Sequence, residues 1–283
     1  MEVGSPSHES PARQRFVARV QSTEEVDLIE LALTIASEEY PMLDETREAR
    51  RVGLIAAEGS RRVHNVDNPF EKLDILRQFF FHELGFCGNQ DDYNDPRNCF
   101  LNDVLDRRTG IPLTLSLLFG ELALASGFKV RGIGLPGHFI LRLEEGDRVI
   151  LVDPFHRGEV VTEDDCRQLV GRTTGRPSLF RRRLLHGSDN RAVLSRLLLN
   201  LKHMYVERED FPRALGCVER LLILHPADST EVRDRGFLLA HLGREGAAIT
   251  DLETYLSSSP HAPDAESVRG RVSWLRRRLS ETN

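Results

Sequence analysis

Cysteine is scarce in this sequence, and the few cysteines present are scattered. Cys87, Cys99, Cys166 and Cys217 form no C-x-x-C pair in a chain of 283 residues. This spacing argues against a zinc ribbon, a thioredoxin-like redox pair and a disulfide scaffold. The first twenty residues have no apolar core or cleavage-like site, so the sequence predicts no secretory signal and a cytoplasmic location. The count leaves open a single nucleophilic cysteine.

Long apolar runs and a strong net charge are also lacking. The longest runs, such as residues 111–115 and 197–199, are too short to cross a bilayer, so no membrane association is expected. With 38 Lys and Arg against 44 Asp and Glu, the chain has a formal charge of −6, and nucleic acid is not an expected partner. The hydrophobic fraction of 40% suffices for a core, and the length favours two domains.

The N-terminal half begins with helical patterns and then changes to strands. Residues 1–20 are polar and are predicted to be a disordered tail. Helices are predicted over residues 23–36 (capped by Ser22 or Thr23), 43–63, from Asn68-Pro69 to Gly85, 100–108 and 111–126. Strands are predicted over residues 129–135, 138–143 and 148–152, and the last two form a hairpin. Helices followed by an antiparallel meander predict an α+β domain over residues 21–170.

A basic, weakly periodic segment, residues 171–191, is interpreted as a linker to a second module. Residues 192–283 are predicted to be entirely helical and contain an internal repeat. Ala214, Leu215, Val218, Leu222 and Pro226 recur 34 positions later as Ala248, Ile249, Leu252, Leu256 and Pro260. This period resembles tetratricopeptide repeats, in which a small residue opens the second helix and proline ends it. A protein or peptide partner is therefore expected at residues 192–283, with a final helix around Trp274 capping the stack.

Three short motifs form a candidate site. Pro112 follows Gly110-Ile111 and opens the buried helix, His138 begins a strand, and Asp153 ends the next strand. A hairpin of this length places His138 and Asp153 near the same end. An aspartate behind a histidine fixes the imidazole tautomer and stabilises its charged form, which serves a general base and also stabilises structure.

These motifs resemble a known family. The segments DPRN (residues 95–98), RTGIP (108–112) and LPGHF (135–139) look like the SirB-type bacterial proteins, which join a transglutaminase-like core to tetratricopeptide repeats. The resemblance implies a cysteine-protease-like α+β domain with a helical N-terminal region, followed by an all-α module. It places His138 and Asp153 on the superfamily's catalytic His and Asp. Pro112 stands where the nucleophilic cysteine of the superfamily is expected, and proline carries no nucleophile.

Another residue could supply the missing nucleophile. Ser116 and Thr114 lie about one turn from the helix start, and Cys99 or Cys87 could approach from the preceding segment. The structural alternative is that both hydroxyls bond to backbone carbonyls of a buried helix and that the thiols are buried.

The neighbouring polar residues also have two readings. They either line a pocket with His138 and Pro112 or tie the loop to the core through caps and an Arg–carboxylate pair; they are Asp95, Arg97, Asn98, Asn102 and Arg108. His156 lies near Asp153, but no third metal ligand has a supporting spacing, so no metal and no other cofactor are predicted.

The sequence therefore favours a non-catalytic, degenerate transglutaminase-like protein that acts in binding or regulation through its pocket and its repeat helices. The alternative is an atypical hydrolase or acyl-transfer enzyme that uses His138 and Asp153 with a displaced nucleophile or an activated water. The oligomeric state is left open.

Overall fold

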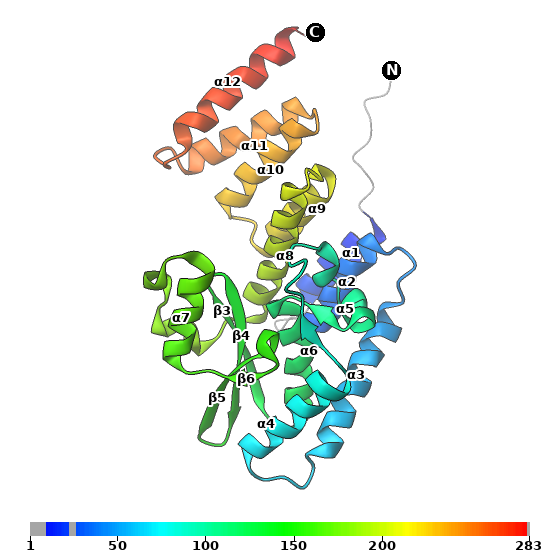
Figure 1. Cartoon of the computed structure of the whole chain (residues 1–283). Helices are drawn as coiled ribbons and strands as arrows, with labels where there is room; N and C mark the ends of the chain where they lie inside the picture. The colour runs from blue at the N-terminus through cyan, green and yellow to red at the C-terminus, as the bar shows by residue number, and fades with distance from the viewer. Residues whose placement is uncertain (1–9, 23–26, 282–283) are drawn as a thin grey trace. The chain divides into compact units, whose positions relative to one another are not determined.

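A computed structural model describes residues 10–22 and 27–281, and the chain divides into two compact units between Leu197 and Leu198 (Figure 1). The N-terminal unit begins with a series of helices. They are α1 (Pro11–Ser22), α2 (Leu28–Glu39), α3 (Glu45–Arg62), α4 (Pro69–Arg77), the π-helix η1 (Gln78–Glu83), α5 (Leu101–Arg107) and α6 (Pro112–Ala125).

Local capping chemistry sets the ends of these helices. The side chains of Asp27, Asp44 and Asn68 accept hydrogen bonds from first-turn amides of α2, α3 and α4. Gly85 and Gly127 adopt positive φ angles of 77° and 96° just after η1 and α6, as expected of residues that end helices. The cap expected at Ser22 or Thr23 is instead Asp27; Thr23 lies outside the described residues, and α2 begins later than predicted.

A four-stranded antiparallel sheet follows α6, and it confirms the predicted meander. Its strands pair in chain order, with Leu135 opposite His138 and Glu145 opposite Arg148 at the two turns. The strands are β3 (Lys129–Leu135), β4 (His138–Glu145), β5 (Arg148–Asp153) and β6 (Glu159–Val160). Two further strands of two residues each, β1 (Cys87–Gly88) and β2 (Thr109–Gly110), pair in parallel in a separate sheet. Helix α6 and helix α7 (Glu163–Thr174) cover opposite faces of the larger sheet (Figure 1).

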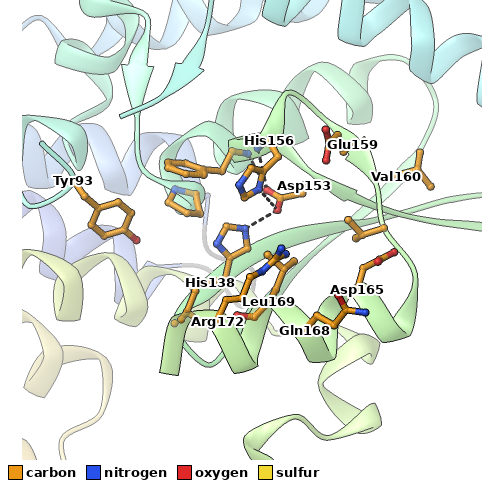
Figure 2. Close-up of a pocket in the computed structure, with 15 residues that line it drawn as sticks. Tyr93, His138, Asp153, His156, Glu159, Val160, Asp165, Gln168, Leu169 and Arg172 are labelled. Carbon is orange, nitrogen blue, oxygen red and sulfur yellow. Dashed lines mark hydrogen bonds and ion pairs between the residues drawn. The ribbon is translucent and has the colours of Figure 1, made fainter. Parts of the chain in front are cut away.

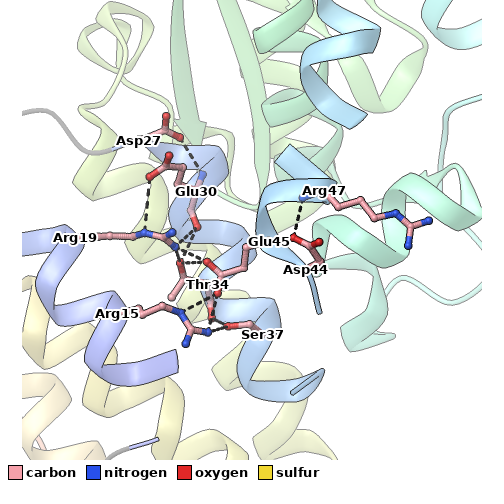
Figure 3. Close-up of polar contacts among 9 residues, drawn as sticks. All are labelled: Arg15, Arg19, Asp27, Glu30, Thr34, Ser37, Asp44, Glu45 and Arg47. Carbon is pink, nitrogen blue, oxygen red and sulfur yellow. Dashed lines mark hydrogen bonds and ion pairs between the residues drawn. The ribbon is translucent and has the colours of Figure 1, made fainter. Parts of the chain in front are cut away.

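The predicted disordered tail is wrong for residues 11–20, because these residues form most of α1; residues 1–9 lie outside the described part. Phe16 of α1 is fully buried. Arg15 and Arg19 both form ion pairs with Glu45 at the start of α3, at 2.8 and 2.5 Å (Figure 3). Burial raises the pKa of Glu45, but the hydrogen bonds from Arg19, Ser37 and Arg15 outweigh it and lower that pKa. The polar composition of residues 11–20 therefore gave no sign of a helix that buries one apolar face and forms ion pairs through its arginines.

The predicted basic linker, residues 171–191, is also wrong. Its first residues complete α7, and two short 3₁₀ helices follow, η4 (Pro177–Leu179) and η5 (Arg182–His186). Phe180 packs in a buried cluster with Ile133, Ile140 and Val170 on the α7 face of the sheet. The Ser188 amide donates to the Gly132 carbonyl of β3 at 2.8 Å. Arg181, Arg182 and Arg183 are exposed, while Phe180, Leu184 and Leu185 pack on the core.

The C-terminal unit is entirely helical within the described residues and has the predicted repeat. The small residues Ala214 and Ala248 are fully buried, and a Cβ on Gly236 would lie 2.8 Å from the Leu252 side chain, so the helices approach closely. Its helices are the end of α8 (Asn190–Glu207), α9 (Phe211–Leu224), α10 (Ser229–His241), α11 (Glu245–Ser258) and α12 (Ala265–Glu281). Among the helices described, none has the length and apolar character needed to cross a membrane.

Candidate functional site

His138 and Asp153 meet at the end of the β-hairpin, as the sequence predicted. Nε2 of His138 lies 2.7 Å from Oδ2 of Asp153, and the two side chains are 5% and 1% exposed. His138 is the first residue of β4 and Asp153 the last of β5, so the antiparallel register places both at the same edge. Gly137 makes the tight turn before His138 with φ of 74°, a conformation that favours glycine.

A second histidine, His156, shares the same carboxylate oxygen. Its Nδ1 lies 2.8 Å from Oδ2 of Asp153, while Oδ1 of Asp153 accepts the amides of Phe155 and His156 at 3.0 and 3.4 Å. Figure 2 shows the two imidazoles side by side with Asp153 joining them, and their ring centroids are 5.7 Å apart. The segment Asp-Pro-Phe-His is the sequence signal for this contact. It forms a 3₁₀ turn that is capped by Asp153 and brings His156 back to that aspartate.

Hydrogen bonding at this site shifts the pKa values of Asp153 and His156. Burial raises the pKa of Asp153, but the hydrogen bonds from His138 and His156 outweigh it and hold that pKa well below its usual range. The hydrogen bond to Asp153 raises the pKa of His156 above its ordinary value. The site is therefore an ionised aspartate that orients two imidazoles through one ring nitrogen each.

These three residues are also the group that could hold a metal ion within the part of the chain described. The ligand atoms of His138, Asp153 and His156 all lie within 4.8 Å of one another. Two histidines and a carboxylate suit zinc or another divalent transition metal. Both nitrogens lie at hydrogen-bonding distance from a single oxygen, however, so the geometry is already satisfied by two N–H donors. Coordination would require both nitrogens to lose those protons.

The cluster of His138, Asp153 and His156 opens onto a cavity of about 850 Å³. Helix α7 contributes Leu169, Arg172 and Thr173 to its wall, and Tyr93 lies across from His138 (Figure 2). Pro112 lines the same cavity and is the first residue of α6. Proline fits this position because a first-turn amide has no intrahelical acceptor. The structure thus places a proline side chain at the cavity wall that also holds His138.

The candidate replacement nucleophiles do not line this cavity. Thr114 is fully buried and donates its hydroxyl hydrogen bond to the Asn98 carbonyl at 2.7 Å, and Ser116 lines a separate cavity between α6 and the sheet. Cys99 is 1% exposed, and Cys87 lines a neighbouring cavity with Phe155 and His156. Thr173 is the lining residue with an aliphatic hydroxyl among those described, and that hydroxyl lies 2.9 Å from the Leu169 carbonyl.

The polar residues predicted to share a pocket with His138 lie elsewhere. Asp95 forms ion pairs with Arg97 and Arg107 at 2.7 and 3.6 Å, and Asn98 bonds to the Asn89 side chain and to the carbonyls of Asp92 and Tyr93. Arg108 lies over the Phe86 ring, and Asn102 is buried in α5. The geometry favours the structural alternative for this group: the contacts hold the loop that carries Tyr93 to the cavity.

Arg196 of α8 is a positioning residue that the sequence did not reveal. Its guanidinium donates to the carbonyls of Leu135 and His138 at 2.6 and 2.9 Å, and it lies over the Phe139 ring. The contact therefore clamps the β3–β4 turn just where His138 leaves it. Burial lowers the pKa of Arg196, but an arginine remains charged there.

Comparisons with known proteins agree with this architecture. The family model of the Transglutaminase-like superfamily matches residues 47–199, and a tetratricopeptide repeat model matches residues 201–273. A "UPF0162 protein" of Xylella fastidiosa is 32% identical over 88% of this chain and 90% of its own length. "Protein SirB1" of Salmonella typhimurium is 30% identical over 81% and 84%, and "UPF0162 protein YchA" of Escherichia coli is 29% identical over 86% and 89%. No solved structure shows a significant match.

The chain therefore belongs to the Transglutaminase-like superfamily and, within it, to the SirB-type proteins that carry tetratricopeptide repeats.

Proposed function

We propose that this SirB-type member of the Transglutaminase-like superfamily is a binding protein, whose histidine cavity receives a ligand without forming a covalent intermediate. The observation that carries the proposal is Pro112 at the N-terminus of α6, on the wall of the cavity that holds His138. A helix N-terminus stabilises a thiolate through its dipole and free amides. With proline at this position, the oriented imidazole has no thiol to deprotonate.

The repeat helices supply the second binding surface of the proposal. Repeat pairs of this kind present a curved helical surface to an extended peptide or a partner helix. The C-terminal unit keeps a rigid interior for this purpose: Lys202 donates to Glu231 and Asp234 at 2.8 and 2.9 Å, and both Lys202 and Glu231 are buried. We expect the protein to exert its regulatory role through a partner that binds to residues 192–283.

Labelling with a thiol-directed activity probe tests the non-catalytic assignment. We expect the wild-type chain to show no labelling that depends on His138, because the cavity offers no thiol. Pro112→Cys is expected to gain labelling that is lost again in Pro112→Cys/His138→Ala, and Pro112→Ala is the matched control without a thiol. Wild-type labelling that disappears on His138→Ala would overturn the assignment.

Hydrolysis by an activated water is the second candidate function. One observation favours it: Nδ1 of His138 has no hydrogen-bond partner among the described residues, although the residue lines the cavity. Turnover of a panel of activated ester and amide substrates distinguishes the two. Activity that follows the ionisation of an imidazole and is lost in His138→Gln would support hydrolysis, whereas no turnover above that of His138→Gln supports binding.

A further inference from the structure

The cavity beside His138 contains polar side-chain groups that have no hydrogen-bond partner among the described residues. His138 uses Nε2 and His156 uses Nδ1 to reach Asp153, and the second nitrogen of each ring has no partner among the described residues. Arg172 lines the same cavity from α7 and makes no hydrogen bond or ion pair within the described chain. Figure 2 shows the Arg172 side chain extending from α7 toward the two histidines. His138 is only 5% exposed, so its free nitrogen faces the cavity and not bulk water.

Two of the three carboxylates that line the same cavity already accept hydrogen bonds. Both oxygens of Asp153 are used, one by the two imidazoles and the other by two backbone amides. Asp165 accepts from the amide and the hydroxyl of Thr162 at 2.8 and 2.7 Å, as part of the cap of α7. Glu159, which is exposed on β6, is the lining carboxylate described without such a bond. Arg172 is thus a lining cation without an anionic partner among the described residues, and it favours a ligand that supplies acceptor oxygens.

The start of α6 adds to this preference. Helix α6 has 14 residues, and its cap residue, Ile111, has no side chain that accepts hydrogen bonds. Its first residue, Pro112, lines the cavity, and the first-turn amides of a helix have no intrahelical acceptor. Such amides, together with the helix dipole, favour an anion at the N-terminus. At the position where the superfamily would carry a thiolate, this chain thus has a helix N-terminus with a partial positive charge and no thiol.

The remaining walls indicate what accompanies the anion. Phe155, Val161 and Leu169 give the cavity an apolar side, and its volume of about 850 Å³ suits a ligand the size of a short peptide or a drug-like molecule. A planar carboxylate pairs with a guanidinium through two parallel hydrogen bonds and carries a single charge. A phosphate dianion would meet the ionised Asp153 behind the two rings and the exposed Glu159.

We propose that the His138 cavity binds a carboxylate that carries an apolar group, with Arg172 as its cationic donor and with His138 and His156 beside it, each of which donates from its second ring nitrogen once protonated. The proposal rests on the proposed non-covalent binding function and names the ligand chemistry of that site. A free small acid and the C-terminus of a peptide with an apolar last residue share this chemistry.

Calorimetric titration of the full chain with N-acetyl-leucine and with N-acetyl-leucinamide tests the proposal. The two probes differ only in the charge of the terminal group. We expect the acid to bind at least about tenfold more tightly than the amide, since a charge-assisted pair to arginine is the stronger hydrogen bond. The acid should also shift the imidazole NMR signals of His138 and His156. An acetyl-dipeptide ending in leucine distinguishes the two sources, because tighter binding than N-acetyl-leucine indicates a peptide C-terminus and equal binding a small acid.

Arg172→Gln is the informative variant, and Arg167→Gln on the same helix is its control. Arg167 faces away from the cavity, lying over Phe180 and pairing with Asp164 at 3.0 Å. We expect Arg172→Gln to weaken binding of the acid about tenfold and to leave the amide unchanged, while Arg167→Gln changes neither.

Three results overturn the proposal: equal binding of acid and amide, no binding of either, or an equal loss in the two arginine variants. Tighter binding of inorganic phosphate than of N-acetyl-leucine overturns the carboxylate assignment. None of these results alters the thiol-labelling outcome, so failure of the ligand class is distinguishable from failure of the non-catalytic function.

Discussion

Removing the Asp153 carboxylate should destabilise the N-terminal unit more than any other single change at the site. The side chain is 1% exposed and accepts hydrogen bonds from two imidazoles and two backbone amides. Charge-assisted hydrogen bonds contribute about 1.5–3 kcal/mol each, and their losses are not additive. Removing one partner of a buried pair costs about 3–5 kcal/mol. We expect Asp153→Ala to lower the free energy of unfolding by about 3–5 kcal/mol.

Asp153→Asn separates the charge from the shape. The amide keeps one oxygen for the backbone amides of Phe155 and His156 but cannot accept from both imidazole N–H groups. We therefore expect a loss of about 2–3 kcal/mol near pH 7, smaller than that of the alanine variant.

The difference between wild type and Asp153→Asn should depend on pH in one direction. The folded pKa of Asp153 lies below its ordinary value of 3.8, so its contribution is present above that value. The contribution is lost as the pH falls through the folded pKa, because Asp153 takes up a proton less readily in the folded state than in the unfolded state. The difference in unfolding free energy should thus be smaller at pH 2–3 than at pH 5.

Hydrogen exchange of the β4 and β5 amides measures this unit directly. The single tryptophan, Trp274, lies in α12 of the C-terminal unit, so its fluorescence during urea unfolding is an internal control that should not change. A loss below about 1 kcal/mol for Asp153→Ala would refute the reasoning, since that is the size of one neutral hydrogen bond. A wild-type-to-Asn difference that grows on acidification would refute the sign.

Three further changes have defined outcomes. Gly137→Ala places a Cβ 2.6 Å from the Thr173 hydroxyl at φ of 74°, so its melting temperature should fall further than that of Gly146→Ala, which has φ of 56° and no atom within 4 Å; equal falls would contradict a steric cause. Lys202→Met leaves Glu231 buried without its cation and should cost about 3–5 kcal/mol by Trp274 fluorescence, with partial recovery in Lys202→Met/Glu231→Leu; no recovery would place the loss in packing. His156→Gln should destabilise the unit more at pH 5.5 than at pH 9. The pKa of His156 is raised in the folded state, so its stabilising contribution is present below the unfolded pKa and is lost as the pH rises through the folded pKa. The opposite order in urea unfolding would show that His156 is neutral in the folded state.

The sequence predicted the parts of the site that depend on short-range regularity. Strand length and turn position were enough to bring His138 to Asp153, since an antiparallel register fixes which residues share an edge. Proline at the start of an apolar run was enough to place Pro112 in the first turn of α6. Each of these depends on residues within one hairpin or one helix end.

The missed parts depend on contacts between distant segments. Tyr93 and Arg172 come from a loop and a helix nearly eighty positions apart, and only the folded chain brings them to one cavity. Arg196 clamps a turn about sixty positions earlier through backbone carbonyls, which leave no trace in the sequence. The polar loop residues such as Asp95 and Asn98 were ambiguous for the same reason, because a capping residue and a pocket residue have the same chemistry.

Pro112 links the proposed function to the proposed ligand. Replacing a nucleophilic cysteine with proline removes the thiol, but it does not remove the positive end of α6, because a first-turn proline is compatible with the helix. The Asp153 carboxylate likewise still orients His138, and the structure adds His156 and Arg172 to the same cavity. The features that stabilise a thiolate in an active enzyme are the features that stabilise any anion. We therefore expect a site that lacks the thiol but keeps these features to bind an anion supplied by a ligand.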